Sequence, residues 1–500
     1  MEGQNRLVLD GQDLEIKEVI EVAFRRKRVE PSSSLLNKLD EGFEKLKNKV
    51  SSGEKVYGLT TGFGSLAEKS VSSEDASCLQ KSLLLSHAQG IGEPLPREVV
   101  RSMLLLRAQT LARNFSGVRG VLITYLMTFL NNDYHPVVPS QGSLGASGDL
   151  IPLAHLALPL IGRGKVEHNN QIIDGKKALQ ELNLLPYSLE LREGLALING
   201  TQAMLSLLIN TLHHSYKLLN LYNLASSMSM EALCSSTSFL NDYVYKVRPH
   251  LGIGRAIAGI KNHLEGSQLV NPNPPHRVQE AYSLRCVPQV HGTTDTALSF
   301  AENIAKVELN SVTDNPLITP ENLIVSQGNF HGAPLAWILD SLAIALIPLG
   351  NMSERRVYKL LSGSYEKSLP SYLSLKPGLQ SGLMILQYQS ASLVNYNKIL
   401  AHPASVDTIP TAQGQEDHVS MGMNAGLKLI KIIDNLYYLL VIELITASRA
   451  LRLQGLNQAG KGAKWFEENY GNQIFHSFED QSLAEEMEYL KKELLERDFP

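Results

Sequence analysis

The chain has 500 residues, of which 43% are hydrophobic, and its formal net charge is -4 at pH 7. This balance gives no strongly basic surface of the kind that binds nucleic acid, and the length is ample for a large core or for two or three domains. Three cysteines (Cys78, Cys234 and Cys286) lie far apart, which indicates a reducing compartment and excludes a disulfide framework.

The N-terminal segment, MEGQNRLVLDGQDLEIKEV, carries acidic residues early and has no continuous apolar run. We therefore expect no signal peptide. The longest apolar stretches, around 335–349 and 436–447, are interrupted by Asp340 and Glu443, and neither reaches transmembrane length. These features predict a cytoplasmic protein that does not associate with a membrane.

Apolar residues recur at three- and four-residue spacing over five stretches, and this spacing predicts helices. The stretches are 98–130, 203–233, 294–313, 333–349 and 425–455. Several are long enough to form rods, and long helices with small residues between them are typical of a bundle. The clearest strand signal is Lys165–Asp174, in which Asn169-Asn170 fits a hairpin turn. We predict a mostly α fold, with a smaller mixed N-terminal region (1–200) and a long central helical bundle with C-terminal helices (201–500).

Four segments rich in Gly, Ser, Asn and Pro lie between these helices, and loops on a rigid scaffold often carry the chemistry of a protein. They are 58–65, 139–149, 269–276 and 402–416. The second contains GSLGASGDL (142–150), with small residues on both sides of Ser147. Taken alone, this run is a tight turn that enters a helix, with Asp149 in the first turn. It is not a GxSxG nucleophile elbow, because residue 149 is not glycine.

A further interpretation of Ala146-Ser147-Gly148 is chemical. If the backbone folds tightly, the Gly148 nitrogen can attack the Ala146 carbonyl carbon, and loss of water closes a five-membered ring. Dehydration of Ser147 then leaves an exocyclic methylidene, so that the product is a methylidene-imidazolone (MIO), a strong electrophile. A side chain at residue 148 would block the compressed turn. Apolar flanks such as Leu144 and Leu150 would keep bulk water away from the reactive carbon.

The run Gly142–Gly162 resembles the signature of the aromatic amino acid ammonia-lyase family, which contains histidine, phenylalanine and tyrosine ammonia-lyases and related aminomutases. Further blocks match in family order and extend the resemblance over nearly the whole chain. They are YGLTTGFG (57–64), GLALINGTQ (194–202), VQEAYSLRCVPQV (278–290), TDNP (313–316), GNFHG (328–332) and AHPASVDTIPTAQGQEDHVSMG (401–422). The resemblance implies a carbon–nitrogen lyase with a self-formed MIO, no metal and no nucleotide. It also implies a homotetramer in which several subunits build each site.

The resemblance assigns roles to residues around the ring. Tyr57 is the expected base for the substrate β-proton, which requires a phenol with a lowered pKa. Thr60, where histidine enzymes often have Asn, departs from the family pattern. Asn199 is expected to hydrogen-bond the carbonyl oxygen of the ring. Tyr282 is expected to polarise the ring, and Phe330 to pack beside it.

Arg285, in the segment YSLRC, is expected to bind the substrate carboxylate. A guanidinium is planar and can pair with a carboxylate through two hydrogen bonds. An isolated Arg is usually a solvated surface residue, but few charges surround this one in the sequence. Gln279 carries over by the same match as a second substrate-binding residue.

Ser86-His87 indicates the substrate, because the resemblance links this pair to histidine lyases, Phe-Leu to phenylalanine lyases and His-Leu to tyrosine lyases. His87 is expected to face the substrate imidazole, with Glu416 at the same end, where a carboxylate can hold an imidazole N–H. Taken alone, His87 is a core histidine and Glu416 an acid at a helix start. Met384 is expected to line the same pocket. The expected reaction converts L-histidine into trans-urocanate and ammonia.

Two alternatives remain open. The first is a tyrosine or phenylalanine ammonia-lyase, or an aminomutase, of the same family; the substrate-end residues disfavour the two lyases but say less against an aminomutase. The second is a helical scaffold or binding protein that has lost catalysis, which predicts decay of the catalytic residues, yet Ser147, Tyr57 and Arg285 are intact. The fourteen histidines show neither HExxH nor Cys/His ligand spacing, so we expect no metal site.

Overall fold

The computed structural model describes residues 6–51, 61–62, 75–274, 278–474 and 477–497. The chain divides into two compact units that alternate along the sequence. Unit 1 comprises Met1–Asn210, Glu302–Asp340 and Pro403–Leu427, and unit 2 comprises Thr211–Ala301, Ser341–His402 and Lys428–Pro500. The predicted regions 1–200 and 201–500 are contiguous, whereas the units are not, because the chain returns twice to unit 1 after residue 210.

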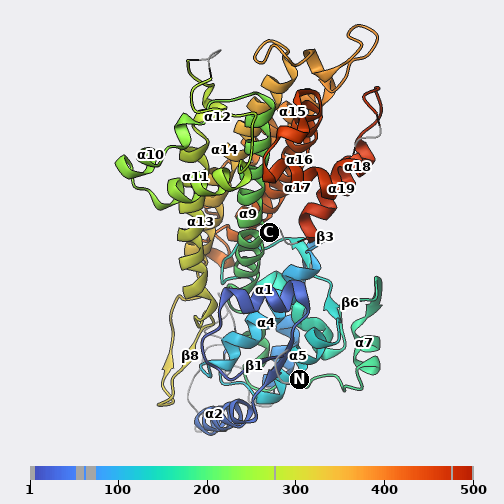
Figure 1. The fold of residues 1–500 in the computed structure, drawn as a ribbon. Helices are drawn as coiled ribbons and strands as arrows, with labels where there is room; N and C mark the ends of the chain where they lie inside the picture. Colours follow the sequence, from blue (N-terminus) through green and yellow to red (C-terminus); the bar gives the residue numbers. More distant parts are fainter. Residues whose placement is uncertain (1–5, 52–60, 63–74, 275–277, 475–476, 498–500) are drawn as a thin grey trace. The chain divides into compact units, whose positions relative to one another are not determined.

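The described strands all belong to unit 1 and form small sheets (Figure 1). They are β1 (Arg6–Leu9) parallel to β2 (Arg28–Pro31); β3 (Ile91–Pro94) antiparallel to β5 (Pro139–Gln141); β4 (His135–Pro136), β6 (Lys165–His168) and β7 (Gln171–Asp174) in one antiparallel sheet; and β8 (Leu317–Ile318) antiparallel to β9 (Ile324–Val325). The predicted hairpin is confirmed, since β6 pairs with β7 through Asn169 and Asn170. Their φ angles of 50° and 60° are the left-handed values that such a two-residue turn requires.

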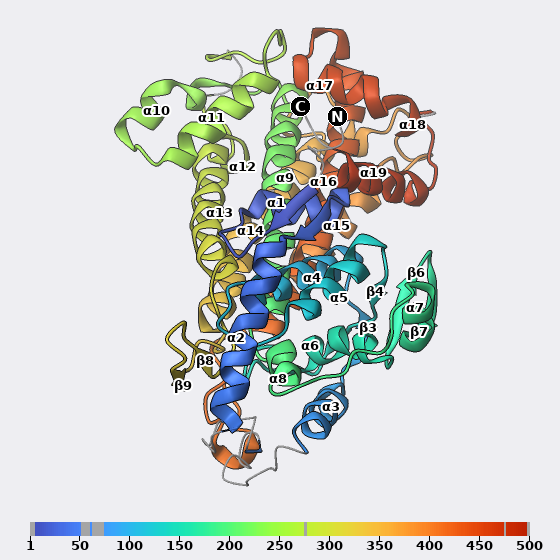
Figure 2. The same ribbon diagram turned by 90° about the horizontal axis from the view of Figure 1, so that it is seen from below.

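Shorter helices make up much of unit 1, and one of them, α4, is buried along nearly its whole length. They are α1 (Ile16–Arg25), α2 (Ser33–Ser51), α3 (Ala76–His87), α4 (Arg97–Ala112), α5 (Gly120–Asn131), α6 (Leu150–Ala157), α7 (Gly175–Glu181) and α8 (Glu193–Ile198). Both ribbon views place α4 beside α5 (Figures 1 and 2), and α6 also packs against α4. The stretch 98–130 is helical as predicted, but it forms two helices, because the chain turns between α4 and α5. Asn114 and Gly117 have φ of 62° and 59° there, while the apolar spacing continues across the break and hides it.

Four long helices have residues in both units: α9 (Gln202–Ala232), α13 (Val287–Leu309), α14 (Ala333–Leu361) and α16 (Gly422–Gln454). Within unit 2 they pack as a bundle. The Tyr222 hydroxyl donates to the Leu436 carbonyl at 2.7 Å and joins α9 to α16. The Thr294 hydroxyl donates to the Ala345 carbonyl at 2.8 Å and joins α13 to α14. The predicted mostly α fold with long helices is therefore confirmed.

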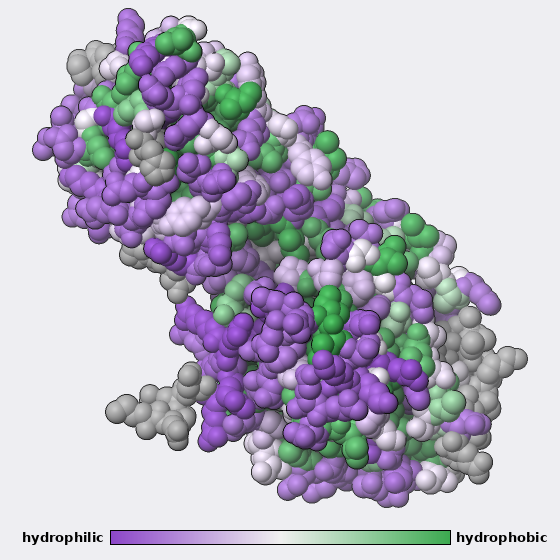
Figure 3. Space-filling model, turned by 90° about the vertical axis from the view of Figure 1, so that its right-hand side faces the viewer, coloured by the Kyte–Doolittle hydropathy of each residue, from purple (hydrophilic) through white to green (hydrophobic). Residues whose placement is uncertain are grey.

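Shorter helices complete unit 2. They are α10 (Asp242–Val247), α11 (Leu251–His263), α12 (Tyr282–Arg285), α15 (Met384–Leu400), α17 (Lys461–Phe466), α18 (Asn472–Ile474) and α19 (Ala484–Glu496). Helix α14 is the one helix among the described residues that is long and apolar enough to cross a membrane, but 61% of its most apolar stretch is buried inside the structure. A core helix has the same character. On the face that Figure 3 shows, polar side chains predominate and apolar ones are scattered between them.

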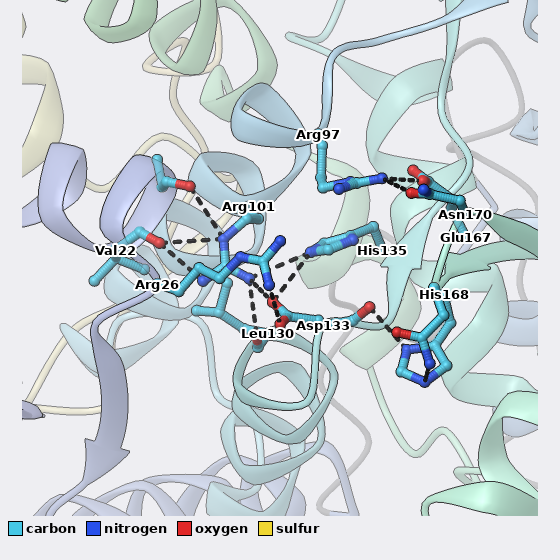
Figure 4. A network of polar contacts seen from close by, with 12 residues as sticks. Val22, Arg26, Arg97, Arg101, Leu130, Asp133, His135, Glu167, His168 and Asn170 are labelled. Atoms are coloured by element: carbon cyan, nitrogen blue, oxygen red, sulfur yellow. Dashed lines mark hydrogen bonds and ion pairs between the residues drawn. The ribbon is translucent and has the colours of Figure 1, made fainter. Parts of the chain in front are cut away.

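Arg101 connects the ends of two helices in unit 1 (Figure 4). Its side chain is 3% exposed. Its Nε and Nη2 atoms donate to the carbonyls of Val22 and Ala23 in the last turns of α1, and Nη1 donates to the Leu130 carbonyl of α5 and to Asp133 Oδ1. The last carbonyls of a helix have no partner within it, so a cation placed there satisfies them and is favoured by the helix dipole.

His135 gives this network a dependence on pH. Its Nε2 lies 3.2 Å from Arg101 Nη1 and must accept a hydrogen bond from it, which only a neutral imidazole can do. Burial and the charge of Arg101 lower the pKa of His135 from 6.5 to about 4. Because the unfolded chain then binds the proton at higher pH than the folded chain, stability is lost as pH falls from 6.5 towards 4.

The free energy of unfolding falls as the pH is lowered, and we expect His135→Gln to make this fall smaller by roughly 3 kcal/mol. This value is the equivalent of the difference between the pKa of His135 in the unfolded and the folded chain. Gln keeps an acceptor for Arg101 but cannot be protonated. The measurement is urea unfolding at pH 7.5 and pH 4.5 for the wild type, the variant and His250→Gln, in which the changed residue is exposed. Equal pH dependence in all three proteins would contradict the assignment.

Candidate active site

A cavity of about 740 Å³ in unit 1 contains Ala146 and Ser147. One side of α3, the start of α6, the end of α8 and several loops, among them 146–147, 326–331 and 412–418, form its wall, and these elements are far apart in the sequence. The predicted site residues that line it are His87, Ala146, Ser147, Asn199, Phe330 and Glu416. The fold therefore brings half of the predicted site together in one unit.

The backbone on both sides of Ser147 adopts conformations that only glycine tolerates well. Gly145 and Gly148 have φ of +76° and +75°. A Cβ on Gly148 would lie 2.2 Å from the Gly200 carbonyl oxygen, and a backbone atom cannot rotate away as a side chain can. Residue 148 must therefore be glycine in this turn, as ring closure within Ala-Ser-Gly also requires.

Asp149 is fully buried directly before α6. Its Oδ2 accepts a hydrogen bond from the Met204 backbone nitrogen at 2.8 Å and makes no cap to α6. Burial raises the pKa of this carboxyl from 3.8 to about 7. The structure therefore differs from the simple helix-start role considered for Asp149, because the carboxyl ties the Ala-Ser-Gly turn to the start of α9.

Asn199, at the end of α8, has its side-chain amide held on both sides. Nδ2 donates to the Ser147 carbonyl oxygen at 2.9 Å, and Oδ1 accepts from the Asn315 backbone nitrogen at 2.6 Å. The buried Arg107 guanidinium donates to the Asn199 carbonyl at 2.9 Å. The Ser147 carbonyl oxygen is the one that an Ala-Ser-Gly ring retains, so Asn199 makes the contact that its expected role requires.

Glu416 and His87 form the polar end of the cavity. Ser147 Oγ donates to Glu416 Oε1 at 3.0 Å, and Thr411 Oγ1 donates to Oε2 at 2.6 Å. His87 Nδ1 lies 2.9 Å from the Leu83 carbonyl oxygen, so this nitrogen carries a proton and Nε2 is the acceptor. Burial lowers the pKa of His87. A carboxylate and a neutral imidazole can together receive N–H groups of a ligand.

Of the other predicted residues, Tyr57 is outside the described residues. Gln279, Tyr282, Arg285 and Met384 belong to unit 2. There Arg285 Nη1 donates to Gln279 Oε1 at 2.5 Å, and the guanidinium lies 4.7 Å from the centroid of the Tyr282 ring. Three predicted residues thus form one cluster, and Met384 begins α15.

Two histidines in the cavity wall were not among the predicted residues. His331 Nδ1 accepts from the Ala333 backbone nitrogen at 3.3 Å, and its Nε2 lies 3.2 Å from His418 Nδ1. The pair joins two loops of the wall. Both residues fall inside blocks that match the family, GNFHG and QEDHVSMG. This match could have identified them from the sequence. No group of three His, Cys, Asp or Glu among the described residues could hold a metal ion.

Comparison with known proteins places these features in context. The family model for aromatic amino acid lyases matches residues 14–470. Histidine ammonia-lyase of Caldanaerobacter subterraneus subsp. tengcongensis is 43% identical over 458 residues, covering 91% of this chain and 90% of its own. Histidine ammonia-lyase of Deinococcus radiodurans is 47% identical over 464 residues, with 92% and 87% covered.

Two solved structures have the same fold. Tyrosine aminomutase from Streptomyces globisporus has a TM-score of 0.93 at 30% sequence identity and covers 98% of this chain and 96% of its own. Histidine ammonia-lyase from Trypanosoma cruzi has a TM-score of 0.89 at 34% identity, with 98% and 93% covered. The expected mostly helical architecture therefore agrees with that of solved relatives.

Proposed function

This chain belongs to the aromatic amino acid lyase family, and we propose that it is a histidine ammonia-lyase that converts L-histidine into trans-urocanate and ammonia. The observation that carries the proposal is the polar end of the cavity. Glu416 and neutral His87 lie in the wall that also contains Ser147. The N–H of a substrate imidazole can donate to the Glu416 carboxylate or to the acceptor Nε2 of neutral His87, whereas a phenyl ring offers no such donor.

We further propose that Ala146, Ser147 and Gly148 form an MIO. The turn fits the ring, because Gly148 has no room for a Cβ and Asn199 donates to the oxygen that the ring retains. The ring supplies an electrophile for the substrate amine and so makes the amine a better leaving group. No metal and no nucleotide enters the proposal.

Side chains outside the ring bind the substrate and remove its β-proton. Arg285 binds the substrate carboxylate, with Gln279 beside it, and His87 and Glu416 orient the imidazole. With both ends held, one Cβ–H bond can point at the catalytic base, and such positioning lowers the entropic part of the barrier. Tyr57 is the proposed base; the β-proton is weakly acidic, so the tyrosine must act as a phenolate.

We propose that the enzyme works in the cytoplasm as a homotetramer in which several subunits build each site. Family resemblance is the main support. Large apolar side chains that remain exposed on the helices of unit 2 are a second support, because a further subunit could cover them. Examples are Ile344 (55% exposed), Tyr388 (56%) and Ile399 (63%). Light scattering of the purified protein tests this assembly.

We expect His87→Leu to lower kcat/KM for L-histidine by about tenfold to a hundredfold, the scale of one lost polar contact to substrate. Turnover of L-tyrosine or L-phenylalanine should fall less, because an apolar side chain does not disfavour an aromatic ring. The measurement compares kcat/KM for the three amino acids in the wild type, His87→Leu and His250→Leu, the last changing an exposed histidine. An equal loss for all substrates would refute the role of His87 in specificity.

A further inference from the structure

The segment 279–285 of unit 2 has an outer and an inner side. Gln279 and Tyr282 are exposed, Tyr282 to 68%, whereas Glu280 is only 4% exposed and Ser283 is buried. The outer side carries the residues proposed to bind substrate. The inner side contains polar groups beside the buried Leu284, and buried polar groups need partners, so these partners help to fix the position of the segment.

Tyr365 is the first such partner. Its hydroxyl donates to Glu280 Oε2 at 2.6 Å, and Glu280 Oε1 accepts from the Ser236 backbone nitrogen at 2.8 Å. The same hydroxyl oxygen of Tyr365 accepts from the Ala281 backbone nitrogen at 2.9 Å. A single phenol oxygen thus holds a side chain and a backbone group of neighbouring residues, and hydrogen bonds to a carboxylate are among the stronger ones.

Arg356 is the second partner. Its side chain is fully buried, and its Nη1 donates to the Ser283 carbonyl at 3.2 Å. Its Nε and Nη2 pair with the two carboxylate oxygens of Glu443 at 2.5 and 2.8 Å, and Ser229 Oγ donates to the same carboxylate at 2.7 Å. A buried ion pair with further hydrogen bonds has one well-defined geometry, because any displacement leaves a charge unpaired. It therefore fixes the backbone next to Tyr282.

We propose that Tyr365 and Arg356 are positioning residues that hold the segment 279–285 so that Arg285 presents its guanidinium to the substrate carboxylate. The proposal rests on the role proposed above for Arg285. Arg285 contacts Gln279 and Tyr282, both on the outer side. Its direction therefore depends on the backbone that carries all three residues, and the two inner partners hold that backbone.

Tyr365→Phe tests the proposal, because it removes one oxygen atom and keeps the ring. We expect KM for L-histidine to rise about tenfold, the scale of a lost hydrogen bond to a charged group, with a smaller change in kcat. The inhibition constant of 4-methylimidazole, which has the ring but no carboxylate, should stay at the wild-type value. The matched control is Tyr134→Phe, which removes a hydroxyl bonded to the Glu181 carboxylate at 2.9 Å in unit 1 and should leave KM unchanged.

Two results would overturn the proposal: an unchanged KM in Tyr365→Phe, or an equal weakening of 4-methylimidazole, which would indicate general damage. Arg285→Lys separates the proposal from its premise. If Arg285→Lys raises KM but Tyr365→Phe does not, the anchoring role is wrong and the proposed function stands. If Arg285→Lys leaves KM unchanged, the carboxylate role of Arg285 itself is wrong. In the double variant we expect Tyr365→Phe to add less than it does alone, since both changes act on one contact.

Discussion

Ser147→Ala is expected to reduce turnover of L-histidine by at least about a thousandfold, as the loss of a central catalytic group does. The proposed ring needs the hydroxyl of residue 147, because its elimination creates the methylidene carbon. In the structure the same hydroxyl makes one 3.0 Å hydrogen bond to Glu416, and alanine occupies less space than serine. The variant should therefore fold as the wild type does and lack only the electrophile.

Intact mass tests this result independently of activity. Ring closure and dehydration release two water molecules, so the wild-type chain should be about 36 Da lighter than its sequence, and Ser147→Ala should not show this deficit. Ser143→Ala, in the same loop, is the control and should keep both the mass deficit and the turnover. Wild-type turnover in Ser147→Ala would refute the ring mechanism.

Gly148→Ala should have a comparable effect for a different reason. The new Cβ would lie 2.2 Å from the Gly200 carbonyl oxygen, and residue 148 has φ of +75°. The turn must open to relieve the clash, which moves the residue 148 nitrogen away from the Ala146 carbonyl carbon. We expect no mass deficit, at least a hundredfold loss of turnover, and a lower midpoint of thermal unfolding.

Gly266→Ala separates the clash from the cost of the backbone conformation. Gly266 has a similar φ of +78°, but a Cβ there would meet nothing within 4 Å. We expect Gly266→Ala to show only the modest loss of stability that a left-handed alanine causes, with full turnover and the full mass deficit. A Gly148→Ala protein that still shows the complete deficit would contradict the tight-turn argument.

Local signals in the sequence predicted local structure well. Asn169-Asn170 marked the hairpin because a two-residue turn needs left-handed φ, which Asn tolerates. The break between α4 and α5 was missed, since apolar spacing records which residues are buried but not whether the helix axis is continuous. The alternation of the two units was also beyond reach, because contacts between distant segments leave no periodic signal in one sequence.

The candidate site depends on such distant contacts. Ser147 and Glu416 are 269 positions apart, and nothing in their local sequence links them; only the resemblance to a family placed them in one site. The partners that fix each group were not predicted at all. Asn315 orients Asn199, and Thr411 holds Glu416. Backbone donors and short polar side chains of this kind are common in any sequence, so composition does not single them out.

The most direct test of the proposed function is an assay of the purified protein with L-histidine, L-tyrosine and L-phenylalanine in parallel, with each product identified by its absorbance and mass. We expect trans-urocanate and ammonia from L-histidine, and little product from the other two. Coumarate or cinnamate as the main product, or a β-amino acid in place of urocanate, would contradict the assignment of histidine ammonia-lyase activity.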